Sequence, residues 1–129
     1  MKNLLLCFIF VSIVVPGVAL QQPCSSPPAL VVHGDFVIEG TAYTGEQPLR
    51  FAQVSLYSRR KLVRRVAADA ESRFTIDHLS PGIYRLYIQR LGSFDVKVVT
   101  TAVESLQQRR YYNFGRTRNG CLHWGFSTN

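Results

Sequence analysis

The sequence predicts an all-β protein, an antiparallel β-sandwich of about seven strands with Greek-key connections. Short segments alternate between apolar and polar residues with a period of two, which is the pattern of strands that have one buried face. Turn signals rich in glycine, proline and asparagine separate these segments roughly every 8 to 12 residues. No long amphipathic helix pattern alternates with the strands, as an α/β fold would require.

Each expected strand is bounded by one of these turn signals. The clearest strand spans residues 51–57, where apolar side chains occupy every second position from residue 52 onward. A Pro-Gly pair at residues 81–82 separates two further strands, and an Asn-Gly pair at residues 119–120 favours a hairpin between the last two. The expected strands are 36–43, 51–57, 62–68, 73–77, 82–90, 94–100, 109–114 and 121–126, and residues 103–108 are the one candidate for a helical turn.

The alternation also assigns side chains to the core between the two sheets. A sandwich buries the inward-facing side chains of neighbouring strands. Aromatic residues at alternating positions are expected in the core too, because they contribute the largest apolar area. The expected core residues are Val54, Leu56, Phe74, Ile76, Tyr84 and Leu86, together with the aromatic residues Phe36, Phe51 and Phe94.

Residues 1–19 have the pattern of a secretory signal peptide. Lys2 supplies the positive charge, residues 4–15 form the apolar run, and the small residues at 17–19 suit a cleavage site. The run is shorter than the roughly 20 residues that a membrane span needs. We therefore expect a secreted or periplasmic protein without a membrane span after cleavage, consisting of an extended N-terminal arm (20–34) and one β-sandwich domain (35–129).

Two cysteines, Cys24 and Cys121, are left once Cys7 is removed with the signal peptide. Export brings them to an oxidising compartment, where a disulfide persists. A bridge between them would close a loop of roughly 97 residues (121 − 24) and stabilise the fold by about 4 to 5 kcal/mol. The alternative is a pair of unlinked thiols in flexible tails. No metal site is predicted, because no second ligand pair follows at zinc-finger spacing.

The chain is strongly basic, with 15 lysine and arginine residues and a formal net charge of +7. Basic clusters occur at residues 59–61, 64–65 and 109–110. One interpretation is an anionic partner, such as a polysaccharide, a lipid headgroup or nucleic acid. The other is a solvated face that keeps a small exported domain soluble. Nucleic acid is the least expected partner, since no recognition motif accompanies the charge.

Aromatic and basic residues gather in the last twenty positions of the chain. Sugar rings stack on exposed aromatic faces, so this segment is a candidate platform for a glycan. Alternatively, its aromatic side chains close one end of the sandwich, because aromatic residues are mostly buried in small domains. The candidate ligand surface comprises Arg109, Arg110, Tyr111, Tyr112, Arg116, Arg118 and Trp124.

No catalytic, metal-binding or cofactor-binding residue is predicted. His33, His78 and His123 are scattered, and no metal-ligand spacing connects them. Asp69 and Glu71 are two residues apart, but they fall in a turn, where acidic residues are common. A domain of this size also leaves little room for a substrate cleft. We therefore expect a protein that is not an enzyme, with a small hydrolase as an alternative.

Four segments together resemble the carboxypeptidase regulatory-like domain family. They are the strand at residues 38–42, the P-L-x-x-A-x-V-x-L strand at 48–56, the Arg-Phe-Thr-Ile strand at 73–76, and the L-x-P-G-x-Y corner at 79–84. They cover about half of the chain that follows the signal peptide. Ser72 stands where the family usually has glycine, and the segment from residue 109 onward lies outside the family pattern.

The resemblance implies a prealbumin-like (transthyretin-like) β-sandwich, a fold that is sometimes grouped with carbohydrate-binding-like folds. It also implies an accessory module that lacks the zinc peptidase site. We therefore expect an exported, noncatalytic binding or structural module. An envelope-glycan binding protein is the first alternative, and the expected partners are an envelope polysaccharide or another exported protein.

Overall fold

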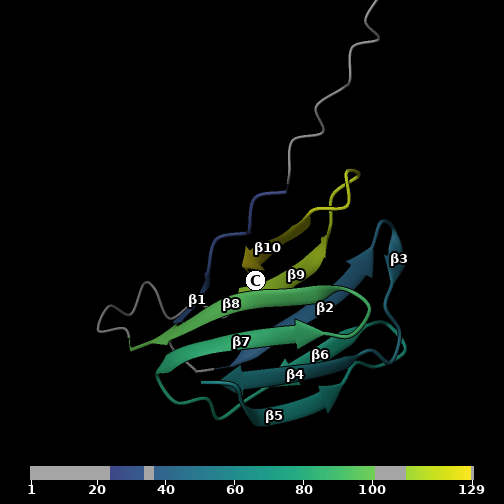
Figure 1. Ribbon diagram of the computed structural model, residues 1–129. Coiled ribbons are helices and arrows are strands. Elements are labelled where there is room, and N and C mark those ends of the chain that lie inside the picture. The colour runs from purple at the N-terminus through teal and green to yellow at the C-terminus, as the bar shows by residue number, and fades with distance from the viewer. Residues whose placement is uncertain (1–23, 34–36, 101–109, 129) are drawn as a thin grey trace, which may run out of the picture.

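The computed structural model describes residues 24–33, 37–100 and 110–128, which form ten β-strands (Figure 1). None of these described residues lies in a helix long and apolar enough to cross a bilayer. The strands are β1 (Leu30–His33), β2 (Ile38–Thr44), β3 (Gln47–Pro48), β4 (Gln53–Ser58), β5 (Lys61–Ala67), β6 (Arg73–Ile76), β7 (Gly82–Ile88), β8 (Gly92–Val99), β9 (Arg110–Arg116) and β10 (Leu122–Thr128).

The strands form two sheets packed face to face, which confirms the predicted β-sandwich. The first sheet has the order β1-β8-β7-β4-β5, and the second has the order β10-β9-β2-β3 with β6 also paired to β2 (Figure 1). The sheets are not purely antiparallel, since β1 pairs with β8 and β2 pairs with β9 in parallel. Apolar-polar alternation is the same in both kinds of pairing, so it cannot reveal strand direction.

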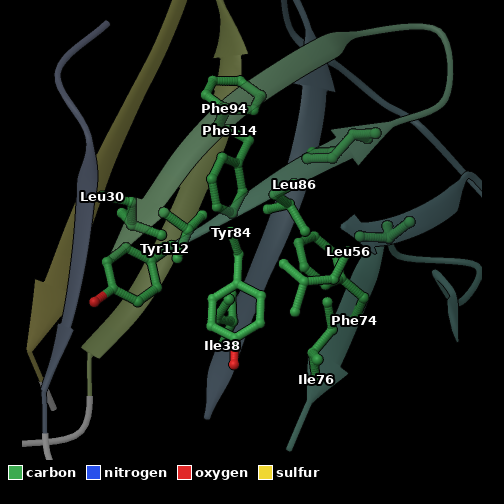
Figure 2. Packing of buried hydrophobic residues seen from close by; sticks show 14 of the residues in the cluster. Leu30, Ile38, Leu56, Phe74, Ile76, Tyr84, Leu86, Phe94, Tyr112 and Phe114 are labelled. Carbon is green, nitrogen blue, oxygen red and sulfur yellow. The ribbon is translucent and has the colours of Figure 1, made fainter. Parts of the chain in front are cut away.

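The core between the sheets contains seven of the nine side chains that the sequence analysis assigned to it (Figure 2). Phe114 of β9 joins the two layers, because its ring centroid lies 4.9 Å from that of Phe94 on the first sheet and 5.8 Å from that of Phe74 on the second. The predicted core residues Val54, Leu56, Phe74, Ile76, Tyr84, Leu86 and Phe94 are all at most 9% exposed.

Phe51 is the exception, and the prediction that it lies in the core was wrong. Its side chain is 66% exposed, and its backbone has φ of +56° in a turn that ends before β4 begins at Gln53. The adjacent Ala52 is fully buried, and it is this side chain that lies in the core. The predicted signal peptide (1–19), Phe36 and the helical turn at 103–108 lie outside the described residues.

The N-terminal arm closes one edge of the sandwich, between β1 and β10. Cys24 and Cys121 form the predicted disulfide. Further along the arm, the Trp124 indole N–H donates a hydrogen bond to the Pro28 carbonyl oxygen at 2.7 Å. The arm then ends in β1, a strand that the sequence analysis did not anticipate. A covalent bond and a strand pairing therefore fix the arm at both of its described ends.

At the opposite edge, a hydrogen-bonded loop between β5 and β6 joins the two sheets. Ser72 has a left-handed backbone with φ of +64°, a conformation that favours glycine. Its hydroxyl is buried, donating to the Ala42 carbonyl oxygen at 2.6 Å and accepting from the Ala42 N–H at 3.2 Å. These two bonds explain how serine occupies a position where glycine was expected.

Candidate functional site

The C-terminal residues predicted to form a ligand surface do not share one surface. Successive side chains of a strand point to opposite faces, so β9 directs Tyr112 into the core and Tyr111 away from it. The Tyr112 ring packs against Trp124, with centroids 6.1 Å apart, and its hydroxyl donates to the Val31 carbonyl oxygen at 3.3 Å. Burial raises the pKa of the Tyr112 phenol above its ordinary value, so the phenol stays protonated as a donor.

Tyr112 and Trp124 match the alternative in which aromatic side chains close one end of the sandwich. Trp124 is half-buried and uses its N–H to hold the N-terminal arm. Phe126 stacks against Trp124 and is 48% exposed, and the guanidinium carbon of Arg110 lies 4.5 Å above the Phe126 ring centre. The exposed remainder of the cluster is therefore one small cation–π pair.

The other arginines of the predicted surface are dispersed. Arg116 donates hydrogen bonds to the carbonyl oxygens of Gly120 at 2.7 Å and Leu91 at 2.5 Å, which ties the β9–β10 turn to the turn before β8. Arg118 is exposed in the β9–β10 turn, and Arg109 lies outside the described residues. Arg116 thus has a structural role in addition to its charge.

A broader surface of suitable chemistry lies on the outer face of the first sheet, and the basic clusters at residues 59–61 and 64–65 noted in the sequence contribute to it. The strand register sets Tyr57 opposite Arg85 and Ile83 opposite Lys97, so their side chains share that face. Ile83 is 75% exposed and Tyr87 is 43% exposed. We call this surface the cationic face, which consists of Tyr57, Arg65, Ile83, Arg85, Tyr87 and Lys97.

Acidic residues are almost absent from this sheet. Within its five strands, Asp95 is the single carboxylate, and it lies 3.3 Å from a guanidinium nitrogen of Arg85. An exposed pair of this kind contributes only about 0 to 1 kcal/mol, so Arg85 remains available to another anion. The same strands hold five lysine and arginine residues: Lys61, Arg64, Arg65, Arg85 and Lys97.

The tight turn between β4 and β5 adds two further cations at one end of this face. Arg59 and Arg60 both have left-handed backbones, with φ of +50° and +65°. A two-residue hairpin turn of this type favours asparagine and glycine, because both central residues need positive φ. Both arginines are exposed, and within the described part of the chain neither forms an ion pair.

The outer face of the second sheet is different, because its polar side chains bond to one another. The Thr41 hydroxyl donates to the Asn113 side-chain oxygen at 2.9 Å. Arg73 pairs with both Asp69 and Glu71, at 3.3 and 3.4 Å. The backbone N–H of Arg73 donates to Asp69, and this bond lowers the pKa of that carboxyl. Asp69 therefore acts as an ionised structural acceptor in its turn.

Among residues 24–33, 37–100 and 110–128, no group of three or more histidine, cysteine, aspartate or glutamate side chains converges in a way that could hold a metal ion.

Comparison with known proteins does not assign this chain to a family. No protein-family model matches the chain, and no curated protein matches it significantly. The chemistry of the described surfaces is therefore the basis for a functional assignment.

Proposed function

We propose that this chain is an exported, noncatalytic binding module of the carboxypeptidase regulatory-like type, and that it binds anionic polysaccharide on the cationic face. The observation that carries the proposal is the composition of that face. The exposed ring of Tyr87 and the half-buried ring of Tyr57 offer stacking surfaces for sugars, and arginine and lysine offer charge-assisted hydrogen bonds to carboxylate or sulfate groups. With Asp95 as the single carboxylate of the sheet, an anionic ligand meets little repulsion.

A location outside the cytoplasm is consistent with this ligand. The disulfide between Cys24 and Cys121 fits an oxidising compartment, where such bridges persist. The signal-peptide pattern of residues 1–19 supports the same location. Surface polysaccharides carrying uronate or sulfate groups occur in that environment, so module and ligand would meet there.

The proposal is tested by isothermal titration of the purified protein with polygalacturonate, dextran sulfate and neutral dextran. We expect binding to both polyanions and none to neutral dextran. The affinity should fall with salt, because screening shortens the reach of charge to about 8 Å at physiological ionic strength and about 3 Å at 1 M. Failure to bind either polyanion at low salt would contradict the proposal and favour a structural module.

A pair of charge-matched variants locates the binding surface. Arg85→Ala/Lys97→Ala removes two cations from the cationic face and should weaken binding about 3- to 30-fold, since each exposed charge pair contributes about 0.3 to 1 kcal/mol. Arg110→Ala/Arg118→Ala removes the same charge from the C-terminal segment and should bind like the wild type. The reverse result would return the site to the C-terminal segment.

A further inference from the structure

Two hollows on the outer side of the first sheet meet at one ion pair. The first, of about 440 Å³, is lined by Tyr57, Ile83 and the turn residues Arg59 and Arg60. The second, of about 420 Å³, is lined by the disulfide, residues 25–27 of the arm, Ser93 and Arg116. Both hollows are also lined by Arg85 and Asp95, so they adjoin at this ion pair, and we call the two hollows together the groove.

The groove runs across the strands rather than along them. Tyr57 lies opposite Arg85, and Arg85 lies opposite Asp95, which places the three positions in one row over β4, β7 and β8. Neighbouring strands are about 4.8 Å apart, so this row spans roughly 10 Å. Beyond β8, the arm that the disulfide anchors forms the end of the groove.

Cations lie at both ends of the groove. Arg59 and Arg60 are at one end, and their left-handed backbones cost about 1 to 3 kcal/mol each, a strain that glycine would avoid. Arg116 is at the other end, where two backbone carbonyls fix its guanidinium group without neutralising it. The groove is therefore preorganised for negative charge, and Asp95 is the single acidic residue in its lining.

We propose that this groove holds a short segment of an anionic polysaccharide, laid across the strands of the first sheet. Acidic groups of the sugar chain contact Arg59 and Arg60 at one end and Arg116 at the other, and a sugar ring stacks on Tyr57. This inference rests on the proposed function and assigns its binding site. An extended chain suits the groove because the two hollows adjoin at Arg85 and Asp95 and so offer neighbouring contacts to one chain.

The first test is the Arg59→Gly/Arg60→Gly variant, titrated with oligogalacturonate and with a sulfated dextran oligosaccharide. We expect binding about 3- to 30-fold weaker than wild type, since two exposed charge contacts are lost. The melting temperature should stay equal or rise, because glycine accepts the positive φ of this turn. Loss of binding therefore cannot be attributed to unfolding.

The matched control is Arg50→Ala/Arg90→Gly. It removes two cations at the opposite end of β4 and β7, and Arg90 also has a left-handed backbone, with φ of +68°. The control should bind like the wild type. Equal weakening of both double variants would overturn the groove and indicate an effect of net charge alone.

Two further variants test the middle and the far end of the groove. Asp95→Asn removes the acid in the lining and should strengthen binding about 2- to 5-fold, because an exposed like charge is lost. Ser25→Asp/Ser26→Asp adds acids at the far end and should weaken binding, whereas Thr75→Asp/Ser127→Asp on the second sheet should not. Unchanged binding by both groove variants would overturn the inference.

The outcomes separate the two proposals. If the wild type binds neither oligosaccharide, the proposed function fails and the groove assignment fails with it. If the wild type binds while all groove variants bind equally well, the function stands and the assigned site is wrong. A single-stranded oligodeoxynucleotide that binds more tightly than both oligosaccharides would overturn the choice of ligand.

Discussion

The two edges of the sandwich are closed by different means. Between β1 and β10, the contacts join residues far apart in the sequence, since the bonded cysteines are 97 residues apart and Trp124 and Pro28 are 96 apart. Between β5 and β6, the loop is held mainly by near neighbours, such as Asp69 and Arg73, four residues apart. The first edge thus depends on covalent chemistry and the second on local backbone geometry.

Removing the disulfide should have the largest effect on stability. Cys24→Ser/Cys121→Ser frees a loop of 97 residues, and chain-entropy arguments give a loss of about 4 to 5 kcal/mol in the free energy of unfolding. Urea denaturation of the variant measures this loss. Wild type treated with dithiothreitol should match the variant, and an unchanged urea midpoint in both would show that the edge does not need the bridge.

Truncating a core side chain between the two edges should lower the free energy of unfolding of the whole sandwich. Phe114→Ala removes a fully buried ring that contacts Phe74 and Phe94 and should cost about 3 to 5 kcal/mol. Phe126→Ala is the matched control on the adjacent strand, where the ring is 48% exposed, and should cost less. Equal losses in urea denaturation would contradict the assigned core.

Substitutions of Ser72 measure how much its hydroxyl stabilises the loop between β5 and β6. Ser72→Ala removes both hydrogen bonds to Ala42 and leaves buried backbone groups without those partners, so it should cost about 1 to 3 kcal/mol. Ser72→Gly removes the same hydroxyl but suits the positive φ, and should be about 0.4 to 1 kcal/mol more stable than the alanine variant. Thermal unfolding of the three proteins checks the order, and an alanine variant as stable as wild type would be inconsistent with it.

The smallest expected effect is the acid sensitivity of the same loop. The hydrogen bond from the Arg73 N–H holds the pKa of Asp69 below its ordinary value of 3.8 in the folded state. Its stabilisation is therefore present above that value and is lost as the pH falls through the folded pKa. Stability of Asp69→Asn should fall less steeply below pH 3.8 than that of wild type. If stability fell equally steeply with pH in both proteins, Asp69 would not contribute to the acid sensitivity.

Much of the sandwich could be predicted from sequence because burial imposes a local pattern. The period-two pattern of β4, β6, β7 and β8 follows directly from the pleat, and the inward side chains of these strands were identified correctly. Phe51 was misassigned because a left-handed turn, which the pattern does not encode, interrupts the strand. β1 was missed because it joins a distant strand after a proline-rich lead-in.

The surface was harder to predict than the core. Tyr111 and Tyr112 are adjacent in sequence, yet the pleat sends them to opposite faces of the second sheet. Conversely, Tyr57 and Arg85 are distant in sequence but lie opposite each other through the register of β4 and β7. A ligand surface depends on such register between strands, whereas clustering along the sequence identifies only the composition of one strand.

The two parallel strand pairs also constrain the order of folding. β4–β5 and β7–β8 are long hairpins joined by short turns. β2 has only the two-residue β3 as a hairpin partner and must find β9, with Thr41 and Asn113 being 72 residues apart. Closing long loops is entropically costly, so local hairpins form before distant pairs. We expect pulsed hydrogen exchange during refolding to protect β4, β5, β7 and β8 before β1 and β2. The strands made earliest on the ribosome would then be the last to be paired, and protection of β2 before β7 would refute this order.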